Sequence, residues 1–236
     1  MSVGDRIATA EGKRRYVRSL FATIADRYDV ITGLLSYGQD RHWKRRLVGL
    51  ARCREWTRGL DLATGTGDIA FLLRDRTAHV VGLDVTPRMV ALARAKRGGS
   101  TSPAFLVGDM TALPFPSGSF DLVTTGYGLR NAPDLPVALD EIFRVLKVGG
   151  QLLSLDFNRP SHRVVCSVYL SYLSVVGGAL GWLLHRDPDT YRYIPASIRR
   201  YPGAQGVVAL LQSRGFRAVK YYPVFGGLMA IHHAEK

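Results

Sequence analysis

The sequence predicts one doubly wound α/β domain built on a mostly parallel sheet. Strand-like and helix-like patterns alternate from about residue 58 to residue 157, in the order that βαβ units produce. A glycine-rich turn at residues 64–67 joins the first of these strands to a helix. The chain has 236 residues and is 47% hydrophobic, so it can bury one substantial core but is short for two full domains.

Two amphipathic helices are expected before the first strand. Residues 14–26 carry apolar side chains at helical spacing. Residues 41–51 repeat the pattern, with Trp43, Leu47 and Leu50 on one side. These helices belong to an N-terminal helical segment, residues 1–57.

Seven strands are expected in all. The cofactor-binding core, residues 58–158, contains five of them, with helices between them. Its strands are predicted at 59–63, 79–84, 104–108, 120–126 and 151–157, and its helices at 67–75, 87–97 and 134–146. A C-terminal part, residues 202–236, adds a helix at 204–213 and β-rich runs at 216–224 and 227–233, which Gly226 and Gly227 join.

An insertion at residues 159–201 separates the fifth strand from the last helix and is predicted to form a substrate lid. Within it, residues 164–184 carry no formal charge, so a membrane span, a buried or lid-forming helix, and a lid that also touches a membrane are all considered. Serine and glycine dilute its hydrophobicity. The following strands must rejoin the same sheet, so both ends of the insertion lie on one side of any bilayer. A lid-forming helix is therefore favoured.

The cysteines and the N-terminus favour a reducing compartment. Cys53 and Cys166 are too few for a disulfide framework and lack metal-ligand spacing, so no metal site is predicted. The first sixteen residues have no apolar core of the kind that a signal peptide needs. We therefore expect a cytoplasmic protein.

The net charge of +13 is concentrated outside the predicted core. Residues 1–60 carry +7, residues 159–201 carry +4 and the last 35 carry +3, whereas residues 61–158 carry −1. Such a shell suits an anionic lipid surface or a nucleic acid, and a solvated surface without a partner is the plain alternative. The strongest membrane candidates cluster on the two N-terminal helices. They are Arg14, Arg15, Arg18, Lys44, Arg45 and Arg46.

The turn after the first strand predicts a nucleotide site. Gly65 and Gly67 permit a tight turn and close backbone approach at a helix N-terminus. Asp84 ends the next strand, where a carboxylate can bind a ribose diol. NAD and S-adenosylmethionine share these requirements, so this turn alone does not decide between them.

Later features favour S-adenosylmethionine. Asp109 and Met110 follow the third strand, where a carboxylate can accept from an adenine amine and a thioether can lie on its ring. The strings LPF at 113–115 and RVLKVGG at 144–150 come next. Taken in order, these features resemble the pattern of class I methyltransferases, whose Rossmann-like fold has a seven-stranded sheet.

Most of the chain, from about residue 21 to residue 232, also resembles one methyltransferase family. The matching strings are FATIADRYD at 21–29, LSYG at 35–38, WKR at 43–45, GYGLRN at 126–131, DFNRP at 156–160, YRYIPASI at 191–198 and GFRAVKYYPVFGG at 215–227. They are similar to the ubiquinone/menaquinone-biosynthesis C-methyltransferases. The resemblance implies S-adenosyl-L-methionine as cofactor and a polyprenyl quinol precursor as substrate.

The resemblance also implies site residues. Together with the glycine turn, it assigns cofactor binding to Gly65, Thr66, Gly67, Asp84, Asp109, Met110 and Gly126. It makes Arg130 and Asn131 the active-site pair. Three positions depart from the family pattern: Thr64 stands where the family often has Gly, Gly126 replaces a common Ser or Asn, and Asp156 replaces a common Glu, with a shorter reach.

Ring methylation predicts roles for these side chains. A quinol becomes nucleophilic at the ortho carbon when its hydroxyl loses a proton, and the permanent cation of Arg130 can stabilise the phenolate. Water near Arg130 and Asn131, or the carboxylate of Asp156, can accept the proton, and Asn131 can orient the hydroxyl or that water. In the insertion, Tyr191 and Tyr193 are expected to contact substrate. Tyr169, Tyr172 and Trp182 add aromatic surface there.

Several alternatives stay open at this point. A methyltransferase of another lipid or aromatic small molecule would share most of these features. A nucleic-acid enzyme or binder is suggested by the charge alone, without an RNA module or a base-flipping motif, so no nucleic-acid partner is expected. A dinucleotide oxidoreductase is the remaining rival. The sequence does not show whether the substrate ring is a naphthoquinol or a benzoquinol. It also does not show whether the chain forms a homodimer. A peripheral position on the inner face of the cell membrane is expected for an enzyme with a membrane-borne substrate.

Overall fold

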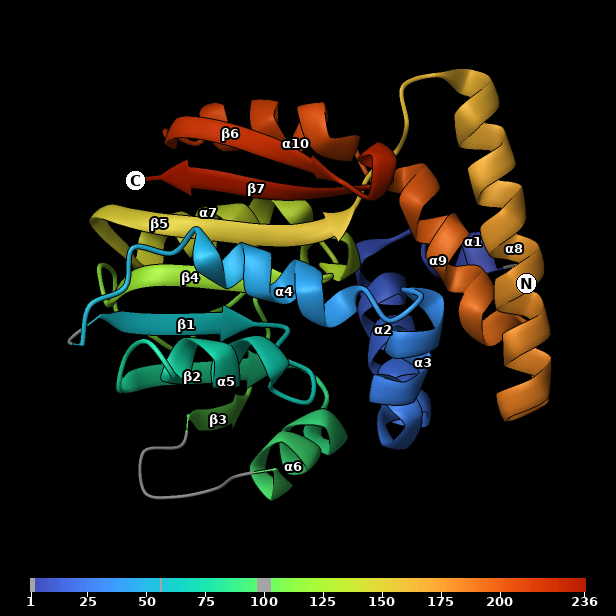
Figure 1. Ribbon diagram of the computed structural model, residues 1–236, viewed down its shortest axis with the longest axis horizontal. Coiled ribbons are helices and arrows are strands. Elements are labelled where there is room, and N and C mark those ends of the chain that lie inside the picture. The colour runs from blue at the N-terminus through green and yellow to red at the C-terminus, as the bar shows by residue number, and fades with distance from the viewer. Residues whose placement is uncertain (1–2, 56, 97–102) are drawn as a thin grey trace.

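A seven-stranded sheet forms the centre of the protein, in a computed structural model that describes residues 3–55, 57–96 and 103–236. The strand order is β3-β2-β1-β4-β5-β7-β6 (Figure 1). The strands are β1 (Arg58–Leu62), β2 (His79–Asp84), β3 (Ala104–Val107), β4 (Phe120–Gly126), β5 (Leu146–Phe157), β6 (Arg217–Val224) and β7 (Met229–Glu235). The first five are parallel, and β7 runs antiparallel to β5 and β6. The predicted doubly wound fold is confirmed.

The strand bounds follow the predicted pattern closely, with one exception. β2 and β4 match residue for residue, but β5 begins five residues before its predicted start. Leu146 already pairs with Phe120, and a register shift separates this pair from the regular pairing that begins at Leu122 and Gln151. Local hydrophobic periodicity does not reveal such an irregular extension.

Helices cover both faces of the sheet and bury an apolar cluster on each. One face carries α4 (Asp40–Gly49), α5 (Asp68–Arg74) and α6 (Pro87–Ala95), and the other carries α7 (Leu135–Val145) and α10 (Gly203–Gln212). Residue 97, the predicted last residue of the α6 helix, lies outside the described residues.

Short helices from the N-terminal segment lie beside the carboxyl ends of the strands (Figure 1). They are α1 (Val3–Arg6), α2 (Ala10–Ile24), η1 (Ala25–Arg27) and α3 (Tyr28–Leu35). The predicted helix at 14–26 begins four residues earlier than expected, because Thr9 Oγ1 accepts a hydrogen bond from Gly12 N at 3.1 Å and caps it. The sequence did not predict α1 or α3.

The insertion forms a pair of helices at the edge of the molecule, α8 (Arg163–His185) and α9 (Asp189–Arg200) (Figure 1). Gly177 permits their close approach, because a Cβ at this position would lie 3.1 Å from the carbonyl oxygen of Tyr191 in α9. Among the described residues, α8 is the one helix that is long and apolar enough to cross a membrane. However, β5 before it and β7 after it pair with each other, so a single crossing is incompatible with the fold. Since its outward side is largely exposed, α8 is not a buried helix.

Candidate active site

Two neighbouring cavities lie at the carboxyl ends of the central strands. The sheet cavity, of about 60 Å³, lies between the turn after β1, the ends of β2, β3 and β4, and α2. The helical cavity, of about 310 Å³, is enclosed mainly by α2, α3, α8 and α9. The two share Phe21, Tyr28, Tyr127 and Asn131. Open α/β sheets bind ligands at the carboxyl ends of the strands, at the point where the strand order reverses. In this sheet the order reverses at β1, which has β2 on one side and β4 on the other.

The turn after β1 is fixed by glycine geometry and by one carboxylate. Gly67 has a φ of 91°, in the left-handed region, and is the N-cap residue immediately before α5. Gly65 N donates to Asp84 Oδ2 at 2.9 Å, and Thr86 N donates to Asp84 Oδ1 at 2.8 Å. Asp84 therefore connects the end of β2 to the turn while it lines the sheet cavity. Burial raises the pKa of its carboxyl group.

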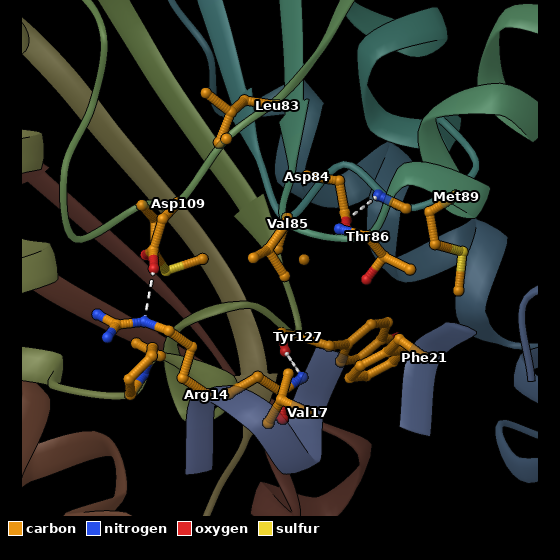
Figure 2. A pocket seen from close by; sticks show the side chains of 18 of the residues that line it. Arg14, Val17, Phe21, Leu83, Asp84, Val85, Thr86, Met89, Asp109 and Tyr127 are labelled. Atoms are coloured by element: carbon orange, nitrogen blue, oxygen red, sulfur yellow. Dashed lines mark hydrogen bonds and ion pairs between the residues drawn. The ribbon is translucent and has the colours of Figure 1, made fainter. Parts of the chain in front are cut away.

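A second carboxylate lies across the sheet cavity from Asp84 (Figure 2). Asp109 Oδ1 accepts from Thr111 N at 2.8 Å, and Asp109 Oδ2 accepts from Arg14 Nε at 2.9 Å. Burial alone would raise the pKa of Asp109, but the hydrogen bonds from Thr111 and Arg14 outweigh it and lower the pKa. Arg14 Nη2 also donates to Thr111 Oγ1 at 3.3 Å, so α2 is tied to the loop after β3.

The structure brings most of the predicted cofactor residues together. Five of them line the sheet cavity: Gly65, Asp84, Asp109, Met110 and Gly126. Thr66 does not line it, and its hydroxyl donates to Asp29 Oδ1 of α3 at 2.6 Å. Gly67 does not line the sheet cavity, but its positive φ fixes the shape of the turn. Contact of these seven residues with cofactor stays a prediction.

The sequence missed one wall of the sheet cavity. This wall is α2, which contributes Arg14, Val17 and Phe21. The periodicity identifies Val17 and Phe21 as an apolar helix face, but it does not reveal which surface that face covers. Tyr127 also lines the sheet cavity and was not predicted. Its place inside the matched GYGLRN string is the signal that could have identified it.

The sheet cavity has the groups that S-adenosylmethionine requires. Two carboxylates, Asp84 and Asp109, can accept from ribose hydroxyls and an adenine amine, and Val85, Met89 and Met110 supply apolar walls. Its volume is nevertheless well below the roughly 300–1,000 Å³ of typical ligand cavities. Arg14 of α2 and Asp109 both line the cavity and form an ion pair within it, so we expect cofactor binding to displace Arg14, and with it α2, from Asp109.

Replacing Arg14 with alanine is expected to raise the association rate constant of S-adenosylmethionine several-fold. The pair with Asp109 is partly exposed and contributes less than about 1 kcal/mol, so the fold should survive. Stopped-flow fluorescence measures the rate. Arg15→Ala is the matched control, because Arg15 pairs with Glu11 on the exposed side of the same helix. An unchanged rate in Arg14→Ala, or an equal rise in both variants, would show that Arg14 does not close the cavity.

The helical cavity is apolar and aromatic. It is lined by four of the five tyrosine and tryptophan residues expected to face substrate, namely Tyr169, Tyr172, Tyr191 and Tyr193. Trp182 does not line this cavity, because its side chain lies on the exposed side of α8. Burial raises the pKa of Tyr191 to about 12 and the pKa of Tyr193 beyond that, so both hydroxyls stay protonated at neutral pH.

Arg130 is buried on the wall of the helical cavity. Its Nε donates to Asp156 Oδ1 at 3.3 Å, its backbone N donates to Asp156 Oδ2 at 2.9 Å, and Nη1 donates to Ser197 Oγ. Its guanidinium also lies 4.9 Å from the centre of the Phe157 ring. Nη2 has no hydrogen-bond partner in the described part of the chain and can meet a ligand oxygen.

Asp156 lies behind Arg130 and lines neither cavity. Phe157 N donates to Asp156 Oδ1 at 2.8 Å, so both carboxylate oxygens already accept hydrogen bonds. Burial raises the pKa of Asp156, and Arg130 opposes that rise. The geometry indicates that Asp156 orients Arg130. It gives no support to Asp156 as the proton acceptor.

Asn131 lies where the two cavities meet. Tyr193 Oη donates to its Oδ1 at 2.9 Å, and its Nδ2 donates to the Tyr127 carbonyl oxygen at 2.7 Å. Tyr191 Oη lies 2.9 Å from His185 Nε2 of α8. The predicted pair Arg130 and Asn131 and the two predicted substrate tyrosines are thus brought together around one cavity.

Two of the six basic residues expected on a membrane surface form ion pairs with carboxylates. Arg14 binds Asp109, as described above. Lys44 is buried, with its Nζ 2.6 Å from Asp40 and 2.9 Å from Asp68. Burial alone would lower the pKa of Lys44, but Asp68, Tyr28 and Asp40 raise it, so it stays charged. The expected exposure was wrong for Lys44, because it meets Asp68, 24 residues away, as well as Asp40. Membrane contact by Arg14 stays a prediction.

The fold and the sequence relate this chain to methyltransferases. A SAM-dependent methyltransferase from Thermotoga maritima superposes with a TM-score of 0.68 at 18% identity, over 93% of this chain and 99% of that one. One from Aquifex aeolicus gives 0.57 at 18% identity, over 81% and 88%. These likenesses show the fold.

Closer relatives show the family. The demethylmenaquinone methyltransferase of Thermus thermophilus is 42% identical over 220 residues, which are 92% of this chain and all of that protein. The ubiquinone/menaquinone biosynthesis C-methyltransferase UbiE of Xylella fastidiosa is 38% identical over 239 residues, covering 99% of this chain and 94% of that one. Residues 9–236 match the ubiE/COQ5 methyltransferase family. The chain is an S-adenosylmethionine-dependent methyltransferase, and it belongs to the ubiE/COQ5 family.

Proposed function

We propose that this enzyme methylates a ring carbon of a reduced polyprenyl quinone precursor. The observation that carries the proposal is the helical cavity: its aromatic walls adjoin the sheet cavity at Asn131, and the buried cation Arg130 lies on its wall. The names of the relatives from Thermus thermophilus and Xylella fastidiosa agree with this substrate class.

The side chains of the helical cavity support phenolate chemistry. S-adenosylmethionine, when bound, supplies an electrophilic methyl group. Arg130 Nη2 can hold a ring oxygen, and the guanidinium charge favours the ionised hydroxyl, which makes the ortho carbon electron-rich. Because Asp156 is fully engaged and the buried tyrosines stay protonated, water near Arg130 and Asn131 is the proton acceptor in this proposal.

A methyl-transfer assay with matched ring types tests the proposed function. Labelled S-adenosylmethionine is incubated with demethylmenaquinone and with a benzoquinone precursor, each in its reduced and its oxidised form. We expect transfer to at least one reduced ring and none to the oxidised rings, because only the quinol can form a phenolate. Transfer to neither ring, together with activity on another compound from a lipid extract, would favour the alternative substrate class.

We also propose that the enzyme is cytoplasmic and binds reversibly to the inner face of the membrane. A polyprenyl tail keeps the substrate in a bilayer, and the net charge of +13 attracts anionic lipids. Arg15, Arg18, Arg45 and Arg46 are the exposed members of the predicted basic cluster. A nucleic-acid partner rests on charge alone and is not proposed.

A further inference from the structure

An apolar stripe runs along the outward side of α8. One side of this helix packs on α9 and buries Gly177 and Gly181. On the other side, Val168, Val175 and Trp182 are 64%, 72% and 67% exposed. Val164 and Leu183 extend the stripe toward the two ends of the helix. Exposed apolar surface of this length marks an interaction site.

The mouth of the helical cavity opens on the same stripe. Tyr37, Tyr172 and Phe225 line the cavity and are also exposed, so they form its rim. The hydroxyl groups of Tyr37 and Tyr172 are in contact across the mouth. Tyr172 belongs to α8 and is one helical turn from both Val168 and Val175. The apolar surface is therefore continuous from the cavity wall to the outside of α8.

Basic residues flank this stripe at both ends of the helix. Arg159 and Arg163 are exposed at its start, and Arg186 is exposed at its end. The 23 residues of α8 include no Asp or Glu. Arginines at the ends of an apolar helix face can contact anionic headgroups, and a tryptophan near one end suits the membrane–water interface, while the face itself meets acyl chains.

We propose that α8 lies in the surface of an anionic bilayer with the Val168–Val175–Trp182 stripe inserted, so that the mouth of the cavity opens directly to the acyl chains. The quinol ring then enters between Tyr37 and Tyr172 while the far part of the tail stays in the bilayer. This inference rests on the proposed function for the identity of the tail. A cavity of about 310 Å³ is at the lower end of the range for drug-sized ligands, so a long tail must extend beyond it. A second copy of the chain on this stripe would cover the mouth, whereas a bilayer leaves it accessible.

Charge substitutions on the stripe test the docking surface. Val168→Glu and Val175→Glu place a carboxylate in the stripe, and neither residue lines a cavity. Val148→Glu is the matched control, because Val148 is 91% exposed and lies near the start of β5, at the opposite end of the sheet (Figure 1). Binding is measured by co-sedimentation with vesicles of phosphatidylglycerol and phosphatidylcholine at low and high salt. Methyl transfer is measured with a short-tailed quinol in solution and a long-tailed quinol in the vesicles.

The expected results separate docking from catalysis. Each stripe variant should bind anionic vesicles about tenfold or more weakly than Val148→Glu and wild type. It should lose activity on the vesicle-borne quinol by a similar factor but keep wild-type activity on the short-tailed quinol. Vesicle binding equal to that of Val148→Glu would overturn the inference, as would loss of a wild-type dimer in the stripe variants, measured by analytical ultracentrifugation. If wild type bound vesicles through the stripe but methylated neither quinol, docking would stand and the proposed substrate would be wrong.

Discussion

Replacement of Arg130 by alanine is expected to lower kcat by about 100-fold or more, with little change in the Kd of S-adenosylmethionine. Arg130 lies on the wall of the helical cavity rather than the sheet cavity, so its loss should affect the reacting ring and not the cofactor. The variant is also expected to show a distinctive pH profile. Its deficit should shrink as the pH approaches about 10, the ordinary pKa of a phenol, because the phenolate then forms without help.

Stability must be separated from catalysis in this experiment. Removal of Arg130 alone leaves Asp156 buried without its partner, which typically costs about 3–5 kcal/mol. The double variant Arg130→Gln with Asp156→Asn removes both charges, so neither is left buried without its partner. It should unfold closer to wild type than Arg130→Ala does and still lack turnover. Arg130→Lys should recover only part of the rate, because a point charge lacks the planar guanidinium fork. Wild-type turnover in Arg130→Ala would remove Arg130 from the mechanism.

Asp84→Ala is expected to weaken S-adenosylmethionine binding about 30- to 150-fold, which corresponds to about 2–3 kcal/mol for lost charge-assisted hydrogen bonds to a ribose. The structure adds a second consequence, because Asp84 also accepts from Gly65 N and Thr86 N. The variant should therefore unfold at a lower temperature. Calorimetric titration well below that temperature measures the affinity.

A carboxylate remote from both cavities supplies the control. Asp121 at the start of β4 accepts from Arg58 N at 2.9 Å and from Lys147 Nζ at 2.8 Å. Asp121→Ala should lose thermal stability without any loss of affinity for S-adenosylmethionine. If Asp84→Ala bound the cofactor as tightly as Asp121→Ala does, the assignment of Asp84 to the site would fail.

The sequence predicted those parts of the fold and the site that depend on the spacing of residues close together in the chain. The alternation of strands and helices led to the seven strands, and the turn at Gly65 and Gly67 led to the edge of the sheet where the sheet cavity lies. Both depend on residues that are close in the chain, whose spacing fixes their geometry.

Long-range partners account for what the sequence did not predict. Arg14 and Lys44 are positively charged residues on amphipathic helices, and such residues are usually solvated. Arg14 instead meets Asp109, 95 residues away, and Lys44 meets Asp68, 24 residues away. The sequence left Asp156 and water near Arg130 as alternative proton acceptors. In the structure, the two oxygens of Asp156 accept hydrogen bonds from Arg130 N and Phe157 N. No periodicity encodes these pairings.

Helix α2 is a wall of both cavities, so we expect the two binding events to be thermodynamically linked. Leu20, Phe21 and Ile24 line the helical cavity, while Arg14 and Val17 of the same helix line the sheet cavity. A displacement of α2 that admits cofactor therefore reshapes the walls around the ring, and a ring held against α2 resists that displacement. We therefore expect cofactor exchange to be slow in the ternary complex and binding to be ordered, with cofactor first and quinol second. Reciprocity requires that each ligand change the equilibrium affinity for the other by the same factor.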